Sequence, residues 1–130
     1  MSVPPPEEAL SYSKIMAKLK EECKRYGIPE PRIIWVEHVK NGKEKLACYF
    51  IGTPVIYLSL SAFREAYRLM WPFRDLLDED FARAIFHELK HYIDSKVFGV
   101  SEEEYLRNKE YYEREAQKYA SKMVKEIFRR

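Results

Sequence analysis

Two histidines and a glutamate lie close together in the stretch "AIFHELKHYID", residues 84–94. His87 and His91 are four positions apart, and Glu88 directly follows the first histidine. Each residue of a helix advances by about 100° and 1.5 Å, so both imidazoles would lie on one side and could reach one ion. Glu88 would lie beside that ion, where a carboxylate can take a proton from the attacking water. The motif therefore indicates metal-assisted hydrolysis, with zinc as the expected metal.

A catalytic zinc site needs three ligands from the protein and keeps a fourth position for water. Glu113, which follows His91 beyond the turn expected at Gly99, is the predicted third ligand. It shares one helical stripe with Ala116 and Ala120, and small residues allow two helices to approach closely. We therefore expect this stripe to pack against the motif helix and to bring the carboxylate to the ion.

Three other residues are candidates for the third ligand, and each has a simpler role. His38 lies beside a predicted hairpin turn, which favours a surface position. Asp94 lies on the motif helix, but its side chain is short, and it is better placed to orient a histidine or to pair with Lys90. Glu115 lies about 200° around the helix from Glu113, on a face with basic residues, which indicates exposure to water. Neither cysteine has neighbours that would support metal binding.

The motif is expected to lie on a helix that Asp78 or Asp80 caps and that Gly99 ends. Apolar residues at helical spacing predict its buried face: Phe81, Ile85, Leu89 and Tyr92 or Ile93. A capping box from Ser101 to Glu104 then opens a long final helix that carries the third ligand.

The first half of the chain is expected to supply a helix and a small sheet. Apolar residues at helical spacing predict a helix over residues 7–26. Three β-rich runs follow, at residues 32–39, 44–51 and 55–60. Asn41-Gly42 provides the positive φ angles of a tight hairpin turn between the first two runs. We expect a three-stranded antiparallel sheet, then a helix from a Ser61 cap to Met70, in an α+β fold.

Composition limits the classes of partner. The 130 residues suffice for one domain, residues 1–130, that buries about two thirds of its unfolded surface. Its 23 basic and 21 acidic residues are interspersed and give a net charge of +2, which does not predict nucleic-acid binding. The apolar stretches are too short and too charged to span a membrane.

The expected location is the cytoplasm, because no secretory signal is visible at the N-terminus. Cys23 and Cys48 lack metal-site spacing and are interpreted as reduced thiols. Charged residues make up 34% of the chain, while glutamine and asparagine are rare, as is typical of heat-adapted proteins.

His-Glu-x-x-His with a glutamate on a later helix resembles the gluzincin clan of zinc metallopeptidases. The order of helix, three-stranded sheet, motif helix and glutamate helix in so short a chain is most similar to the small archaeal minigluzincins. The run "EREAQKYA" at residues 113–120 resembles the E-x-E-A-(D/N)-x-x-A pattern of integral-membrane gluzincins and of gluzincins that cleave phage-type repressors. The resemblance implies a zincin-like fold, zinc ligands His87, His91 and Glu113, and Glu88 as general base and acid.

The chain departs from these relatives at two points. Gln117 stands where several of them carry an aspartate, so its amide oxygen could accept a hydrogen bond from an imidazole without adding charge. No further histidine is expected at the oxyanion, so Tyr112, Tyr119 or the metal alone would have to stabilise it. Helix packing is the alternative role for both tyrosines.

Three functions are compatible with these residues. The leading one is a zinc endopeptidase that binds an extended peptide along the edge of its sheet. The second is a regulatory peptidase dedicated to one protein partner. The third is a non-catalytic interaction domain, in which the metal is absent or zinc is structural and the aromatic-rich surface binds a partner. The resemblance to minigluzincins also implies a latent state, in which the C-terminal "KEIFRR", with apolar Phe128, or a second copy fills the cleft.

Overall fold

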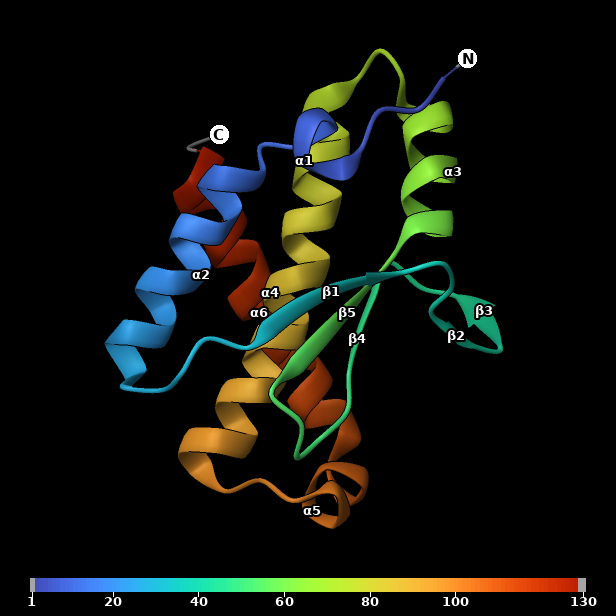
Figure 1. Ribbon diagram of the computed structural model, residues 1–130. Helices are drawn as coiled ribbons and strands as arrows, with labels where there is room; N and C mark the ends of the chain where they lie inside the picture. The colour runs from blue at the N-terminus through green and yellow to red at the C-terminus, as the bar shows by residue number, and fades with distance from the viewer. Residues whose placement is uncertain (1, 129–130) are drawn as a thin grey trace.

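The fold is built around one long helix, with a small sheet lying across it (Figure 1). The computed structural model describes residues 2–128, apart from the side chain of Asn41. The elements follow in the order α1 (Pro6–Ala9), α2 (Tyr12–Tyr26), β1 (Arg32–Val36), β2 (Lys40–Asn41), β3 (Lys43–Glu44), β4 (Ala47–Tyr49), β5 (Val55–Ser59), α3 (Leu60–Met70), α4 (Arg74–Phe98), α5 (Glu102–Arg107) and α6 (Lys109–Phe128). The structure therefore mixes helices with a three-stranded sheet, as an α+β fold requires.

Helix α4 is the centre of the molecule and carries the His-Glu-x-x-His motif. It contacts α2, α3 and α6 as well as β4 and β5. The predicted apolar face is confirmed, because these residues are at most 1% exposed: Phe81, Ile85, Leu89, Tyr92 and Ile93. Gly99 ends the helix in the left-handed conformation, with φ 66°, as predicted. The motif therefore lies on a helix that packing holds from several sides.

The predicted N-cap of this helix is wrong. Helix α4 begins at Arg74, with Phe73 in the cap position, and the Phe73 side chain provides no cap hydrogen bond. Asp78 is buried and accepts hydrogen bonds of 2.7 Å from both the backbone nitrogen and the hydroxyl of Ser11. These bonds satisfy the chain where the predicted first helix divides into α1 and α2. The buried Asp78 carboxylate therefore joins α4 to the start of α2 and does not cap its own helix.

The sheet is mixed, and the prediction of an antiparallel sheet is wrong. Its strand order is β1-β5-β4; β5 pairs with β1 in parallel and with β4 in antiparallel orientation. Strand β5 lies in the middle, and it contains Ile56 and Leu58, which are fully buried. Because its apolar residues form an almost continuous run, β5 can be covered on both sides, whereas β4 is left as an edge.

The turn at Asn41-Gly42 does form, but it joins the short strands β2 and β3 and not the strands of the main sheet. Gly42 has a φ of 86°, which suits a glycine in a tight hairpin turn. The cap of α3 is Ser59 and not Ser61, since the Ser59 hydroxyl accepts a hydrogen bond of 3.0 Å from the Ala62 nitrogen. The predicted end of that helix, at Met70, is confirmed.

The expected final helix is divided into α5 and α6. Ser101 caps α5 as predicted, with its hydroxyl 3.1 Å from the Glu104 nitrogen. At Asn108 the backbone leaves the helical region, with φ −125° and ψ 39°. The chain therefore bends between Tyr105 and Glu113, and the two side chains can meet across the bend.

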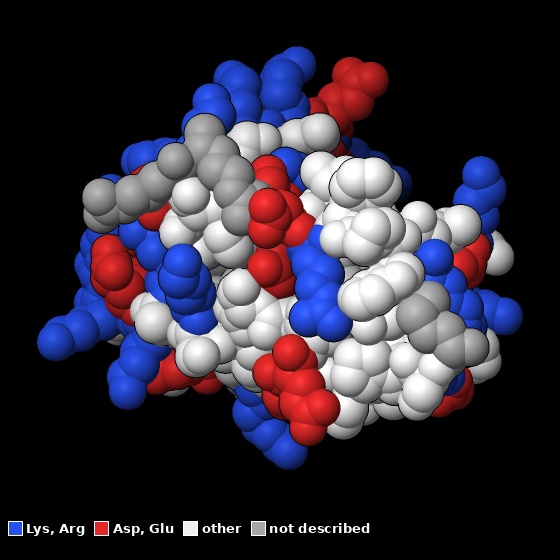
Figure 2. Space-filling model, turned by 90° about the horizontal axis from the view of Figure 1, so that it is seen from above, with Lys and Arg blue, Asp and Glu red and all other residues white. Residues whose placement is uncertain are grey.

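Charges of both signs are interspersed on the face seen from above in Figure 2. Uncharged side chains gather where α3 ends and α4 begins. There, four large apolar residues are exposed: Leu69, Trp71, Phe73 and Leu76. Among the described residues, no helix is long and apolar enough to cross a membrane.

Candidate metal centre

Helices α4 and α6 bring together the three predicted ligands. Nε2 of His87 lies 2.7 Å from Oε2 of Glu113, and Nε2 of His91 lies 3.2 Å from Oε1 of the same carboxylate. The ligand atoms of all three residues lie within 4.8 Å of one another. One imidazole thus faces each oxygen of the carboxylate, and this group could bind a metal ion.

Small residues at the predicted positions of α6 allow it to pack closely against α4. Ala116 and Ala120 of α6 are fully buried, on the stripe that also carries Glu113. Larger side chains at these positions would hold the helix axes further apart. The turn at Gly99 and the short helix α5 supply the chain reversal that brings α6 back against α4 (Figure 1).

The side chain of His91 gives an independent indication that the site fits a metal ion. Its Nε2 is buried, and within residues 2–128 it lies 3.2 Å from Glu113 without a satisfied hydrogen bond. A buried nitrogen without a partner costs free energy, about 1–3 kcal/mol for a polar group of this kind. An ion at the centre of the three ligands would satisfy this atom. Two imidazoles and a carboxylate are a ligand set found in catalytic zinc sites, and imidazole also binds other transition metals.

The charged groups of the site shift one another's pKa values. The hydrogen bond with His87 and the contact with His91 hold the pKa of the Glu113 carboxyl far below its usual range. The same carboxylate raises the pKa of His87, and the nearby charge of Glu88 adds to this effect. Glu113 is therefore ionised and ready to ligate a cation, while protons compete with the metal at His87.

Glu88 lies beside the ligands and lines the same cleft. Burial raises the pKa of its carboxyl, and the two motif histidines partly offset this effect. A raised pKa brings a carboxylate closer to the range in which it can accept and return a proton near neutral pH. The structure places Glu88 next to the three ligands without making it one of them.

Tyr105 of α5 is a site residue that sequence reasoning missed. Its hydroxyl donates a hydrogen bond to Oε1 of Glu113, and its ring lies edge-on to His91 with the centroids 5.3 Å apart. Burial and the Glu113 carboxylate raise the pKa of Tyr105, so its proton stays on the hydroxyl. Tyr105 thus orients the third ligand.

The two tyrosines proposed from the sequence have other partners. Tyr119 donates a hydrogen bond of 2.9 Å to the buried Glu22 of α2, so it joins two helices. Tyr112 lies 3.4 Å from a carboxylate oxygen of Glu104. Both contacts agree with the packing role considered for these residues.

The remaining candidates lie outside the ligand group. Asp94 pairs with Lys90, and Glu115 pairs with Lys118 at 3.3 Å. Gln117 lines the cleft near Glu113. His38 is half-exposed and also lines the cleft, where its Nδ1 lies 2.6 Å from a Glu44 oxygen.

The cleft in front of the site is large enough for a peptide. Its volume is about 1410 Å³, above the roughly 300–1,000 Å³ of typical small-molecule sites. Its walls are the edge strand β4, the exposed side of α4, and α5 with the start of α6. Cys48 of β4 lines it as a free thiol; Cys23 is also free, and burial raises its pKa to about 11.

Comparison of the chain with models of protein families, with curated proteins and with solved structures found no match. The geometry and the chemistry of this site are therefore the basis for its function.

Proposed function

We propose that the protein is a zinc-dependent metallopeptidase of the gluzincin type that acts in the cytoplasm. The observation that carries the proposal is the convergence of His87, His91 and Glu113 on one point, with Glu88 beside it in an open cleft. Three protein ligands with an open side are typical of catalytic zinc sites, whereas structural zinc sites are closed by four.

Zinc, when bound, would supply Lewis-acid chemistry at the scissile carbonyl. The chain itself supplies the proton transfers, the ligand orientation and the binding of the peptide. Glu88 would accept a proton from the attacking water and return it to the leaving amine, a role that its raised pKa favours. Tyr105 keeps Glu113 in place through its hydroxyl group.

The edge strand β4 would hold the peptide. Strand β4 pairs with β5 on one side only, and its three residues, Ala47, Cys48 and Tyr49, all line the cleft. The free N–H and C=O groups of such an edge can pair with an added strand. Backbone pairing would place an extended peptide across the front of the metal ligands.

Replacing Glu88 with alanine tests this function. The zinc-loaded variant should keep its fold and its zinc content but lose hydrolysis of a peptide library by several orders of magnitude, because Glu88 moves the proton and does not hold the metal. Glu115→Ala is the matched control, since it removes a carboxylate outside the site. Undiminished hydrolysis by Glu88→Ala, or loss of its zinc, would contradict the assigned role.

A regulatory peptidase dedicated to one partner is the nearest alternative. It would use the same site but leave casein and generic peptide libraries intact while cleaving its own partner. A digest of generic substrates by the zinc-loaded protein separates the two, since only the general endopeptidase should produce fragments.

A non-catalytic binding domain is favoured by one separate observation. The exposed apolar surface where α3 ends and α4 begins includes Leu69 and Phe73, which are 76% and 64% exposed. Exposed apolar patches often mark contact surfaces. If metal analysis found no zinc and Phe73→Ser abolished association with a partner, this second function would replace the first.

Latency through the protein's own C-terminal tail receives no support from the fold. Phe128 packs against the hydrophobic core, and Arg129 and Arg130 lie outside the described residues. Helix α6 rises about 1.5 Å per residue, so Phe128 lies roughly 20 Å along the axis from Glu113. Occupation of the cleft by a second copy stays a prediction, which the oligomeric state in solution would test.

A further inference from the structure

The two ends of the cleft differ in chemistry. Strand β4 and helix α4 run in the same direction along it (Figure 1). At the end where β4 finishes, apolar and aromatic residues line the cleft, namely Phe50, Ile51, Tyr105 and Leu106, and one charge of each sign, Glu102 and Lys109, lies beside them on α5 and α6. At the end where β4 begins, it is lined by His38, Lys40 and Lys45, with Asp80 and Arg83 of α4.

Basic side chains gather at this end, while the carboxylates of Glu88 and Glu113 line the cleft nearer the candidate metal site. Arg83 and Asp80 pair with each other at 3.3 Å. Lys45 has an exposed side chain, and in residues 2–128 its ammonium group forms no ion pair with a carboxylate. Lys45 lines the same cleft as His87 and Glu88, so its charge faces the candidate metal site.

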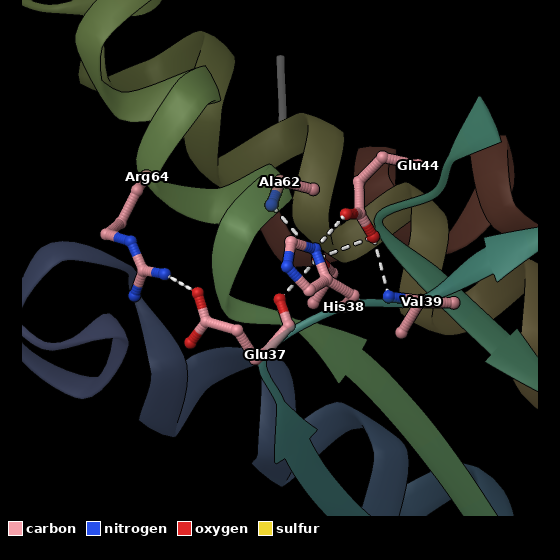
Figure 3. A network of polar contacts seen from close by, with 7 residues as sticks. Glu37, His38, Val39, Glu44, Ala62 and Arg64 are labelled. Atoms are coloured by element: carbon pink, nitrogen blue, oxygen red, sulfur yellow. Dashed lines mark hydrogen bonds and ion pairs between the residues drawn. The ribbon is translucent and has the colours of Figure 1, made fainter.

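A hydrogen-bond network fixes the backbone from which Lys45 projects (Figure 3). Glu44 accepts hydrogen bonds from the Val39 nitrogen at 2.6 Å and from the Ser59 hydroxyl at 3.1 Å, and it also contacts the His38 ring. The backbone nitrogen of Lys45 donates a hydrogen bond of 2.8 Å to the Val39 carbonyl oxygen. The base of the β2–β3 hairpin is thereby tied to the start of α3, and Lys45 leads from it into β4.

We propose that this basic end is a subsite for a carboxylate group of the peptide, with Lys45 as its main contact and Lys40 as a supporting charge. The inference rests on the proposed peptidase function. A peptide that pairs with β4 in antiparallel orientation, the more stable pairing, runs from the apolar end to the basic end. The carboxylate therefore belongs to the part of the peptide downstream of the scissile bond, either as an acidic side chain or as its free C-terminus.

Peptide binding tests the subsite without relying on hydrolysis. The protein is used as Glu88→Gln, which blocks turnover, and binding of fluorescent peptides is followed by anisotropy with and without zinc. Two pools are matched in length and differ only in carrying glutamate or lysine at one downstream position. We expect the acidic pool to bind about threefold to fivefold more tightly at low salt, as a partly exposed ion pair allows, and the difference to shrink at high salt.

Charge reversal at Lys45 provides the decisive comparison. In the Glu88→Gln background, Lys45→Met should remove the preference and Lys45→Glu should turn it toward the basic pool. Lys43→Glu is the matched control, because Lys43 is exposed on the same hairpin but does not line the cleft. Equal binding of the two pools by the Glu88→Gln protein with Lys45 intact would overturn the proposal. So would a change of preference in Lys43→Glu as large as that in Lys45→Glu.

A further pair of peptides distinguishes the two sources of the carboxylate. Peptides with a free or an amidated C-terminus are compared, each with and without a downstream glutamate. Loss of the preference on amidation would assign the subsite to the C-terminus, and its persistence would assign it to the side chain. Absence of hydrolysis by the wild-type protein together with an intact binding preference would refute the peptidase function but leave the subsite standing.

Discussion

At the scale of single residues, Glu113 determines whether a metal centre exists. Its two carboxylate oxygens face one histidine each, and Tyr105 donates to one of them. Glu113→Gln keeps the size of the side chain but removes its charge and one acceptor, so it should lower zinc affinity by at least about tenfold to a hundredfold. Titration against a chelator of known affinity measures this loss.

The competing carboxylates serve as controls for that measurement. Glu115 pairs with Lys118 and Asp94 with Lys90, so neither reaches the ligand group. Glu115→Gln and Asp94→Asn should change zinc affinity far less than Glu113→Gln does. A larger loss in either of these variants would mean that α6 lies against α4 in a different register.

Zinc affinity should also depend on pH, because His87 must lose its proton to bind a metal. The pKa of His87 is raised in the metal-free protein, so protonation of this residue persists to a higher pH than for a free histidine. We expect apparent zinc affinity to rise steeply from about pH 6 to pH 8, by up to about tenfold per pH unit for each proton displaced. Chelator competition at several pH values would show this slope, and a flat profile would contradict it.

Without zinc, the stability of the folded protein should decrease as pH rises through the pKa of His87, whereas zinc affinity increases over the same range. Because the pKa of His87 is raised on folding, its pair with Glu113 contributes stability that is complete below about pH 6.5 and is lost as pH rises through the raised value. The lowered pKa of Glu113 makes the same pair weaken only when pH falls well below about 4. Thermal melts without zinc should therefore show this contribution between those limits. An increase in metal-free stability from pH 6 to pH 8 that disappears in Glu113→Gln would contradict the assignment.

At the scale of elements, periodic patterns in the sequence predicted what local spacing determines. The buried face of α4, the stop at Gly99 and the alanine stripe of α6 follow from the period of a helix, and all three are confirmed. The order of the strands is set by contacts between distant segments. The run "VIYLSL" was assigned to the third strand, but its continuous apolar character is also the signal that it lies in the middle of the sheet.

The non-helical backbone at Asn108 explains why the contact between Tyr105 and Glu113 could not be predicted from the sequence. In one continuous helix Tyr105 and Glu113 would be separated by about 12 Å along the axis. The bend at Asn108 brings the hydroxyl of one into contact with the carboxylate of the other. No periodic pattern signals such a contact, since it depends on the position of α5 against α6.

Tyr105→Phe tests this contact between the elements. The ring would still pack against His91, but Glu113 would lose one hydrogen bond, so zinc affinity should fall by about tenfold. Tyr112→Phe is the matched control, since the Tyr112 hydroxyl contacts Glu104 and not a ligand. Equal zinc affinity of wild type and Tyr105→Phe, measured against a chelator, would show that Tyr105 does not orient Glu113.

At the scale of the whole molecule, the candidate metal ligands join α4 to α6, two helices that packing already holds together. Buried apolar residues of α6 anchor it without any ion: Ala116, Ala120, Met123 and Val124. Tyr119 adds its hydrogen bond to Glu22 of α2. We therefore expect the metal-free protein to remain folded, unlike small domains that fold only around zinc.

Zinc should then raise the melting temperature without being required for folding. An ion that binds only the folded state at about 1,000 times its dissociation constant adds roughly 4 kcal/mol of stability. For a chain of this size that corresponds to a shift of about 10–20 °C. Thermal unfolding followed by circular dichroism, with zinc and after chelation, measures the shift. At the same zinc concentration, a tenfold to hundredfold weaker affinity should reduce the shift in Glu113→Gln by about one third to two thirds. Complete loss of helical signal on chelation would mean that the ion, and not the packing of α6 on α4, holds the fold together.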